Sequence, residues 1–207
     1  MADRILLFGG TFDPVHHGHL IVARSVAEQC GYERVVLIPS ARPPHKDPAH
    51  AEAPDRLAML RLAAAGEELF EVSDIELSGE GASYTIHTLE ELARRWGGRR
   101  ELNLLIGADM LADLPNWHRS AEVVALARIV VAARPPWQER IDEILRGLRG
   151  RLADEAVDRL AEAMVPTALI DISSTEVRRR VAGGLSIRFL VPEAVAAYIS
   201  HHGLYGA

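Results

Sequence analysis

Four short apolar runs stand out along the chain. They are Ile5–Phe8, Val35–Ile38, Leu102–Ile106 and Ile129–Ala133, and Asn103 is the one polar interruption within them. The other three runs show no alternation of apolar and polar residues, which is typical of strands buried on both faces of a parallel sheet. We therefore expect these four runs to form the centre of such a sheet.

Helical patterns separate these runs. Amphipathic spacing covers His19–Cys30, Pro54–Ala65 and Ile86–Trp96, and a glycine follows each of the three. Glycine is the usual residue just past the end of a helix. Strand alternating with helix predicts a doubly wound, Rossmann-like α/β fold, in which a parallel sheet carries helices on both faces. The 207 residues suit a single domain, 1–207, whose ligands bind at the carboxyl ends of the strands.

The segment Trp137–Met164 has a different pattern. Its apolar residues are spaced as in two amphipathic helices that are interrupted near Gly147–Gly150. Packing of both helices on the sheet is the simpler interpretation, and a contact in a homo-oligomer is the alternative. The pattern by itself does not choose between them.

The loop that follows the first run, Gly9–His19, is rich in glycine and histidine. Glycines at a strand-to-helix turn let the backbone approach a phosphate, and the helix N-terminus attracts the anion. The loop lacks G-x-G-x-x-G, and Pro39-Ser40 after the second run supplies no acidic residue for a ribose, which excludes a dehydrogenase. No Gly-Lys-Ser/Thr follows, which excludes a Walker loop. A different kind of phosphate-binding loop is therefore indicated.

Two histidines in this loop are candidates for catalysis. His16 and His19 lie three residues apart at the expected helix start, a spacing that can place both rings on one side. Imidazoles there can donate hydrogen bonds to phosphoryl oxygens and stabilise developing charge. Incidental surface histidines in a capping loop are the simpler alternative, and a zinc site is another. A zinc site would require a companion Glu, Cys or His at ligand spacing, and the loop contains no Glu.

A second candidate phosphate site starts at Ser173. Ser173 and Glu176 have the spacing of a capping box, so a helix should begin here. Arg178 lies four residues after Ser174 and three after Thr175, on the same face of that helix. A helix N-terminus, two hydroxyls and a guanidinium would then converge on one point and make a phosphate clamp. An ordinary cap on a basic surface helix fits the same residues.

Composition narrows the class of protein. The net charge of −6 argues against a nucleic-acid partner, while local basic clusters at Arg42–Lys46 and Arg178–Arg180 suit a small anionic ligand. Cys30 is the only cysteine, so no internal disulfide can form and a reducing compartment fits. The N-terminus lacks a signal-peptide pattern, and Arg128 and Arg134 interrupt the longest apolar segments too soon for a membrane span. We expect a cytoplasmic protein with no membrane partner.

Four strings together resemble one protein family. Gly9–Leu20 resembles the signature of the nucleotidyltransferase superfamily with an H-x-G-H motif. With Pro39–Lys46, Ser83–Leu89 and Ile172–Arg178 added, the set resembles the bacterial nicotinate-nucleotide adenylyltransferases, and the resemblance runs from the first apolar run to His202–Tyr205, nearly the whole chain. It implies adenylyl transfer from ATP to nicotinate mononucleotide, giving nicotinate adenine dinucleotide and pyrophosphate, a step of NAD biosynthesis.

The resemblance also implies how the reaction proceeds. The mononucleotide phosphate would attack the α-phosphorus of ATP in line, without an enzyme nucleophile, so that catalysis would be positioning plus charge stabilisation. Mg²⁺ would arrive with ATP, coordinated mainly by phosphates and water, with no metal ligand from the protein. The predicted catalytic residues are His16, His19 and Arg178.

Two sets of binding residues follow from these loops and from the resemblance. The residues predicted to bind ATP are Gly9, Gly10, Thr11, Phe12, Gly18, His19, Gly107, Asp109, Ser173, Ser174, Thr175 and Arg178. The residues predicted to bind the mononucleotide are Arg42, His45, Lys46, Ser83, Tyr84, Thr85, Trp117 and Arg134. The resemblance puts Gly107 and Asp109 around the adenosine ribose. It stacks Trp117 on the pyridine ring and gives the nicotinate carboxylate to backbone groups near Thr85.

The chain departs from the family pattern at two places. His87 stands where the motif commonly has Asp, which leaves the local helix start open, and Ala133–Pro136 has Pro where Gly is common. Two other functions share part of the pattern. A phosphopantetheine adenylyltransferase or a cytidylyltransferase would share the H-x-G-H loop, but the strings around Thr85 and Trp117 argue against both. A nucleotide-sensing module without turnover should have lost one of the catalytic residues, and all of them are intact.

Overall fold

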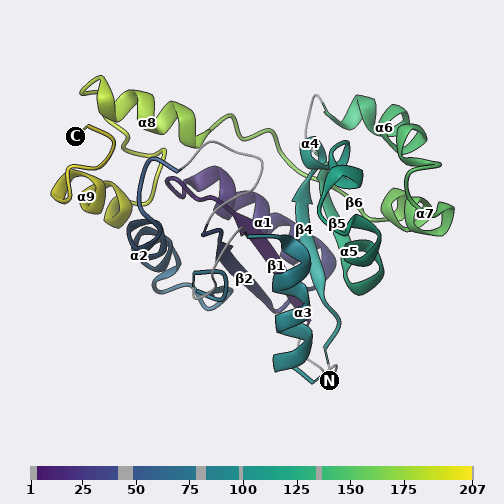
Figure 1. Ribbon diagram of the computed structural model, residues 1–207. Coiled ribbons are helices and arrows are strands. Elements are labelled where there is room, and N and C mark those ends of the chain that lie inside the picture. Colours follow the sequence, from purple (N-terminus) through teal and green to yellow (C-terminus); the bar gives the residue numbers. More distant parts are fainter. Residues whose placement is uncertain (1–3, 42–48, 78–82, 98–99, 134–136, 207) are drawn as a thin grey trace.

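A single parallel sheet carries the fold. The computed structural model describes residues 4–41, 49–77, 83–97, 100–133 and 137–206. In these ranges six strands pair in parallel in the order β3-β2-β1-β4-β5-β6 (Figure 1). The strands are β1 Ile5–Gly10, β2 Arg34–Pro39, β3 Phe70–Val72, β4 Asn103–Gly107, β5 Arg128–Ala133 and β6 Met164–Pro166. The chain reverses its direction of travel across the sheet between β1 and β4, as in doubly wound Rossmann-like folds.

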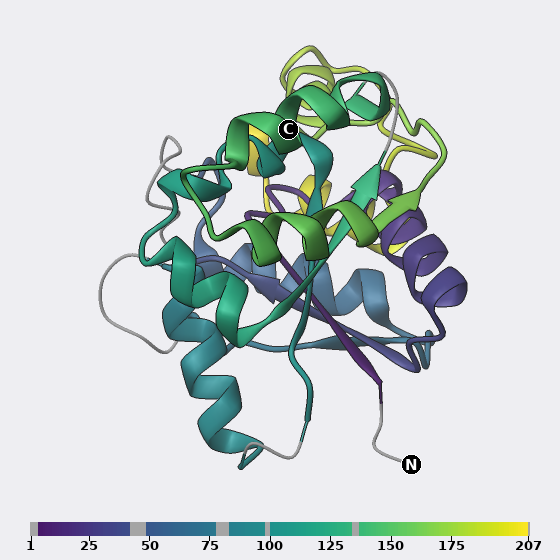
Figure 2. The same ribbon diagram turned by 90° about the vertical axis from the view of Figure 1, so that its right-hand side faces the viewer.

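Helices cover both faces of this sheet (Figures 1 and 2). They are α1 His17–Cys30, α2 Ala53–Ala64, α3 Thr85–Arg95, α4 Ala108–Leu111, α5 Ser120–Leu126, α6 Ile141–Leu148, α7 Asp154–Glu162, α8 Ser174–Ala182 and α9 Glu193–His201, with 3-10 turns η1 Leu114–Asn116, η2 Trp137–Arg140 and η3 Leu204–Gly206. The buried side chains of α1, α2, α8 and α9 join one core, and those of α3 to α7 join the other.

Successive side chains of each central strand belong alternately to these two cores. Leu7, Leu104 and Ile129 belong to the core beneath α3 to α7, whereas Leu6 and Leu105 belong to the core beneath α1 and α2. Because both faces of the strand are covered, every position needs an apolar side chain. This explains why the runs show no alternation, and the predicted parallel sheet is confirmed.

The other predicted elements can be compared with the structure directly. The four apolar runs are β1, β2, β4 and β5, and the three helical patterns are α1, α2 and α3. The patterns miss β3 and β6, which have three residues each and form the two edges of the sheet. Trp137–Met164 forms α6 and α7, whose buried residues join the core. Helix α7 contacts β5, as expected for packing on the sheet, while α6 packs against α7 and η2. Within the described ranges, every helix falls short of the length and apolarity that a membrane crossing needs.

Candidate active site

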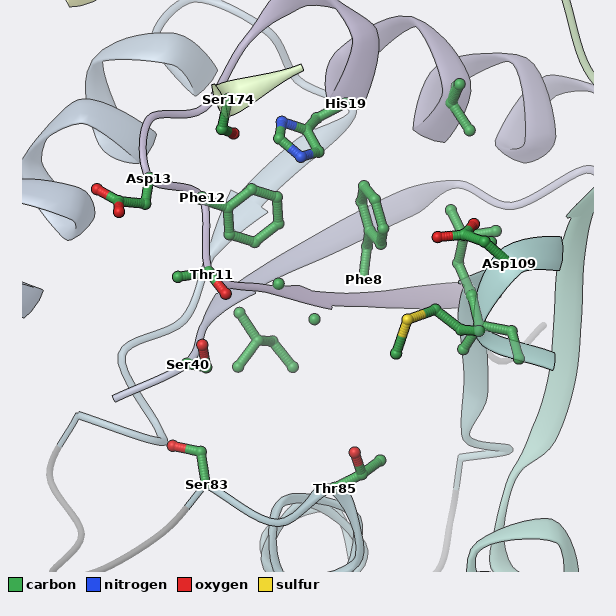
Figure 3. A pocket seen from close by; sticks show the side chains of 18 of the residues that line it. Phe8, Thr11, Phe12, Asp13, His19, Ser40, Ser83, Thr85, Asp109 and Ser174 are labelled. Carbon is green, nitrogen blue, oxygen red and sulfur yellow. The ribbon is translucent and has the colours of Figure 1, made fainter. Parts of the chain in front are cut away.

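A pocket of about 850 Å³ lies at the carboxyl ends of β1, β2 and β4 (Figure 3). This is where the strand order reverses, the place where doubly wound sheets bind their ligands. Its walls come from the β1–α1 loop and from the starts of α1, α3, α4 and α8. The volume falls within the range of small-molecule sites, about 300–1,000 Å³.

The pocket gathers every predicted site residue that the structure describes. On its walls are His16 and all of the predicted ATP residues, which are Gly9, Gly10, Thr11, Phe12, Gly18, His19, Gly107, Asp109, Ser173, Ser174, Thr175 and Arg178. The predicted mononucleotide residues on its walls are Ser83, Tyr84, Thr85 and Trp117. The remaining four, Arg42, His45, Lys46 and Arg134, lie outside the described residues. Segments far apart in the sequence therefore build one site.

The two predicted catalytic histidines stack against each other. Their ring centroids are 3.7 Å apart with an interplanar angle of 26°, and both rings belong to the pocket wall. His16 is the N-cap of α1, and its backbone N–H donates to Nδ1 of His19 at 3.3 Å. Because Nδ1 accepts this bond, the neutral ring carries its proton on Nε2. Nε2 is thus the donor nitrogen of His19, the form that a phosphoryl oxygen requires.

Neighbouring residues hold this pair of rings in place. A Cβ at Gly18 would come within 2.9 Å of His16 Nδ1, so glycine is required for the stacked arrangement. Phe12 meets the His19 ring edge-on, with 5.0 Å between the ring centroids. The prediction that the spacing places both imidazoles on one side is confirmed.

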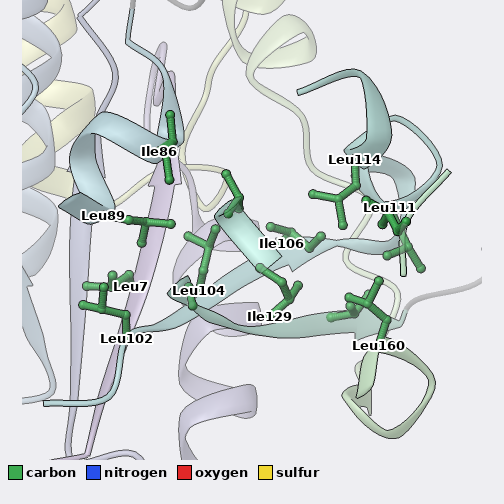
Figure 4. Packing of buried hydrophobic residues seen from close by; sticks show 14 of the residues in the cluster. Leu7, Ile86, Leu89, Leu102, Leu104, Ile106, Leu111, Leu114, Ile129 and Leu160 are labelled. Carbon is green, nitrogen blue, oxygen red and sulfur yellow. The ribbon is translucent and has the colours of Figure 1, made fainter. Parts of the chain in front are cut away.

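Asp109 lies at the rim of the pocket, in the first turn of α4. Its carboxylate folds back over Gly107 and fills the space that a Cβ there would need, so an alanine at this position would displace the carboxylate. The turn is anchored from behind by Leu111 and Leu114, which are fully buried beside Ile106 (Figure 4). The apolar core on this face of the sheet therefore sets the position of the Asp109 carboxylate.

The start of α8 is attached to the histidine loop rather than isolated beside it. Ser174 Oγ donates to the carbonyl of Pro14 at 2.9 Å. The Arg178 guanidinium donates to the carbonyl of Asp13 at 2.6 Å and to Thr175 Oγ1 at 3.3 Å. The predicted convergence holds for Thr175 and Arg178, while the Ser174 hydroxyl turns to the loop. Any ligand held by this clamp is therefore held relative to the histidines.

The predicted capping box at this helix forms only in part. Ser173 is the N-cap of α8, and its Oγ accepts the backbone N–H of Glu176 at 3.1 Å, as expected. Among the described contacts, the Glu176 carboxylate pairs with Arg179 at 2.8 Å instead of returning to the cap. One of the two bonds suffices to start the helix at Ser174.

Asp13 is a site residue that no sequence pattern identified. It lines the pocket, is 4% exposed, and accepts the backbone N–H groups of His50 at 2.7 Å and Ala51 at 3.1 Å and the hydroxyl of Tyr205 at 2.8 Å. Burial alone would raise the pKa of Asp13, but these hydrogen bonds and the positive charge of Arg178 outweigh burial and lower the pKa. A buried anion therefore lies at the base of the histidine loop.

Arg56 is the second residue that the patterns miss. It lies on α2, is 1% exposed, and donates to the carbonyls of Thr11 at 2.6 Å, Ala51 at 3.1 Å and Ala41 at 3.4 Å. Burial lowers the pKa of Arg56, and the carboxylate of Asp13 acts in the opposite direction. Arg56 thus connects three backbone segments around the pocket. One feature of the sequence indicates that Arg56 is buried: buried apolar residues follow it three and four positions later on the same helix.

The start of α3 is held by a largely buried carboxyl group. Glu76 accepts the hydroxyl of Thr88 at 2.6 Å. Burial raises the pKa of Glu76, and hydrogen bonds from Thr88 and Ser83 oppose that rise. Ser83 Oγ also accepts the backbone N–H of Ala41 at 2.9 Å. These bonds fix the first turn of α3, which begins at Thr85, on the pocket wall.

Aromatic rings line the same end of the pocket. Trp117, Tyr84 and His118 all belong to its wall, and the Tyr84 and His118 ring centroids are 4.4 Å apart. The ring of His87, an exposed residue in the first turn of α3, lies 5.7 Å from each of the Tyr84 and His118 rings. Because α3 begins at Thr85, histidine at position 87 is compatible with the helix start that the sequence left open.

Comparison with known proteins first defines the class. Residues 7–180 match the family described as Cytidylyltransferase-like, so the fold and the pocket are those of a nucleotidyltransferase of this class. A Pseudomonas fluorescens protein named "Probable nicotinate-nucleotide adenylyltransferase" is 44% identical over 100% of this chain and 99% of that protein. A Dehalococcoides mccartyi protein with the same name is 39% identical over 96% of this chain and 95% of that protein. The chain belongs to the nicotinate-nucleotide adenylyltransferase family.

Solved structures share the fold. The Plasmodium falciparum nicotinic acid mononucleotide adenylyltransferase complexed with NaAD superposes with a TM-score of 0.75 at 16% identity, over 98% of this chain and 97% of that chain. The same enzyme complexed with APC gives a TM-score of 0.72 with the same coverage. The predicted Rossmann-like fold, the predicted family and, with the family, the predicted class of enzyme are confirmed.

Proposed function

We propose that this enzyme moves the adenylyl group of ATP onto the phosphate of nicotinate mononucleotide, making nicotinate adenine dinucleotide and pyrophosphate for NAD biosynthesis. One observation carries the proposal. A single pocket joins two helix N-termini, which suit phosphates, to an aromatic end that suits a pyridine ring. Both substrates of such a reaction can therefore lie in one cavity with their phosphates adjacent.

The phosphate end of the pocket is electropositive because of its backbone. The helices α1 and α8 have 14 and 9 residues, and both begin on the pocket wall. The positive dipole ends of both helices attract a triphosphate. His19 and Arg178 add side-chain donors at the same place, and Asp109 is assigned to the ribose hydroxyls of ATP.

The opposite end is assigned to the mononucleotide. Trp117 supplies a flat surface for the pyridine ring, and the first backbone N–H groups of α3, from Thr85 onward, supply donors for its carboxylate. The mononucleotide-binding roles predicted for Arg42, His45, Lys46 and Arg134 stay part of the proposal, since these four residues lie outside the described ranges.

The chemistry is a direct displacement. An oxygen of the mononucleotide phosphate forms a bond to the α-phosphorus of ATP while the bond to the bridging oxygen breaks, and pyrophosphate leaves with the electron pair. No protein nucleophile takes part. His16 and His19 donate hydrogen bonds to the phosphoryl oxygens as charge develops, and Arg178 holds the triphosphate in line.

Mg²⁺ is expected to accompany ATP. Over the described residues, no three His, Cys, Asp or Glu side chains gather closely enough to hold a metal ion by themselves. Mg²⁺ bound with a nucleotide usually takes its ligands from phosphate oxygens and water, and we infer the same arrangement here. When bound, the ion would neutralise charge on the leaving pyrophosphate. The chain 1–207 is taken as one catalytic domain, and a cytoplasmic location stays a prediction.

A pyrophosphate-release assay tests this function. Purified enzyme is supplied with ATP or CTP and with nicotinate mononucleotide, nicotinamide mononucleotide or phosphopantetheine, and the dinucleotide product is identified by mass. We expect turnover with ATP and nicotinate mononucleotide. If the enzyme turns over only with phosphopantetheine as the acceptor, or only with CTP as the nucleotide donor, it is a sister transferase. Nucleotide binding without turnover on any acceptor would assign a sensing module.

The same assay measures the preference for the acid over the amide. Two pyridine rings stack alike on Trp117, so discrimination falls to the donors near Thr85. A carboxylate accepts two of them, whereas an amide turns one NH₂ donor toward a donor. Each such opposed buried contact costs about 1–3 kcal/mol, roughly ten- to hundredfold in kcat/KM. Equal kcat/KM for the two mononucleotides would refute the acid-selective pocket and leave adenylyl transfer itself standing.

A further inference from the structure

The last turn of the chain reaches the histidine loop. Tyr205 lies in η3, and its hydroxyl donates to Asp13 Oδ1 at 2.8 Å across 192 residues of sequence. The turn packs against α8 and α9, and the C-terminal end lies beside these helices in Figure 1. Burial and the neighbouring Asp13 carboxylate raise the pKa of Tyr205, so the phenol stays protonated and acts as the donor. Tyr205 thus bonds to a residue of the pocket wall.

The backbone at Tyr205 is adapted to this contact. Its φ is 60° and its ψ is 21°, a left-handed conformation that costs a non-glycine residue roughly 1–2 kcal/mol. Such conformations persist where the surrounding structure determines them, and they cluster at functional positions.

Asp13 connects Tyr205 to the predicted catalytic groups. Its carboxylate is held on one side by the N–H groups of His50 and Ala51 and on the other by Tyr205. Its backbone carbonyl accepts the Arg178 guanidinium at 2.6 Å. Three residues further on, His16 is the N-cap of α1. A shift of Asp13 would therefore move Arg178 and the histidine pair.

We propose that Tyr205 is a positioning residue for adenylyl transfer, acting through Asp13 on the loop that carries His16 and His19 and on the Arg178 clamp. The proposal rests on the function proposed above. Tyr205 itself touches neither substrate. Its hydroxyl stops the Asp13 carboxylate from turning and so keeps the loop in the geometry that the in-line displacement requires.

Replacing Tyr205 with phenylalanine removes one oxygen and retains the ring. We expect Tyr205→Phe to lower kcat about 10- to 100-fold, the loss that follows from a misplacement of about 1 Å. The KM for nicotinate mononucleotide should change by less than about twofold, since the aromatic end of the pocket is untouched.

The pH profile supplies a second readout. The Asp13 carboxylate faces Tyr205, His50 and the guanidinium of Arg178, and the charge of Arg56 also acts on it. Losing the Tyr205 hydroxyl removes one of the bonds that lower the pKa of Asp13. The acid limb of the kcat/KM profile should therefore move to higher pH in Tyr205→Phe.

The chain offers a matched control in Tyr198. Its hydroxyl donates to Asp55 Oδ1 at 2.9 Å and joins α9 to α2 away from the pocket. Tyr198→Phe loses the same kind of bond and should keep kcat within about twofold and the wild-type pH profile. Melting temperatures of both variants measure any structural loss separately.

A double-mutant cycle decides whether the effect passes through Asp13. The enzyme is assayed as wild type, Tyr205→Phe, Asp13→Asn and the double variant, with ATP and nicotinate mononucleotide. If Tyr205 acts through Asp13, the double variant is no slower than Asp13→Asn alone. The proposal is overturned if the two effects multiply, or if Tyr205→Phe lowers only the melting temperature. Wild-type turnover on nicotinate mononucleotide tests the proposed function separately. If it fails, the ATP Kd by calorimetry replaces kcat in the same cycle.

Discussion

His19 gives the sharpest test of the proposed chemistry. In His19→Ala the imidazole, and with it the Nε2 donor, is removed from the pocket wall. Three structural contacts are lost as well: the bond from the His16 backbone N–H at 3.3 Å, the ring stack on His16 at 3.7 Å and the edge-on contact with Phe12 at 5.0 Å. The question is whether the loss of activity exceeds what these three contacts can explain.

The magnitudes separate the two effects. Loss of one donor to a developing oxyanion lowers kcat by about 10²–10³, which corresponds to about 2.7–4 kcal/mol. Loss of the capping contact costs about 1 kcal/mol of stability, and loss of each of the two ring contacts costs about 0.5–1.5 kcal/mol. A domain with about 5–15 kcal/mol of stability remains folded after such a loss. A hundredfold fall in kcat cannot therefore come from unfolding.

Position 17 supplies the control for this experiment. His17 is the first residue of α1 and is not among the lining residues, although it adjoins the loop that bears the other two histidines. His17→Ala should keep kcat within about twofold. Both variants are assayed for pyrophosphate release at saturating ATP and mononucleotide, after urea titrations confirm that each is folded. If His19→Ala turns over like His17→Ala, the assignment of His19 to the transition state is wrong.

Three further outcomes are expected. Arg178→Lys retains the charge but loses the planar fork, so kcat/KM for ATP should fall about ten- to hundredfold by initial-rate kinetics, and an unchanged value would place the clamp elsewhere. Arg56→Met should lower the urea-derived free energy of unfolding by about 3 kcal/mol, because three buried carbonyls lose their donor. Arg61→Met, which breaks only the exposed pair with Asp74, should cost less than about 1 kcal/mol; equal losses would contradict the buried role of Arg56. The folded-state pKa of Asp13 is lowered, so its ionised form stabilises the fold above the unfolded pKa, and that contribution is lost as pH falls through the folded pKa. Melting temperatures of wild type and Asp13→Asn should therefore differ at neutral pH and converge in acid. A difference that stays constant with pH would argue against a stabilising contribution from ionised Asp13.

The sequence alone determined the main features of this protein. Strands buried on both faces are apolar at nearly every position, so β1, β2, β4 and β5 are visible as apolar runs, with Asn103 the one polar interruption. Glycine beside His16 and His19 indicates a phosphate-binding loop, because glycine lets the backbone approach a phosphate and the imidazoles can donate hydrogen bonds to it. Such local features predicted the fold and the family, and every predicted site residue that the structure describes lines the pocket, whereas Asp13 was not identified.

Tertiary structure decided the rest, for physical reasons that particular residues make clear. The strands β3 and β6 have three residues each, too few to show a period, and only pairing with a neighbour defines them. Arg56 is buried because the carbonyl of Thr11, after β1, and those of Ala41 and Ala51, between β2 and α2, surround it. Asp13 and Tyr205 are 192 residues apart, and neither residue's neighbours in sequence indicate the bond between them. Local periodicity reports which face of an element is buried, whereas the partner of a buried polar group depends on how distant segments pack together.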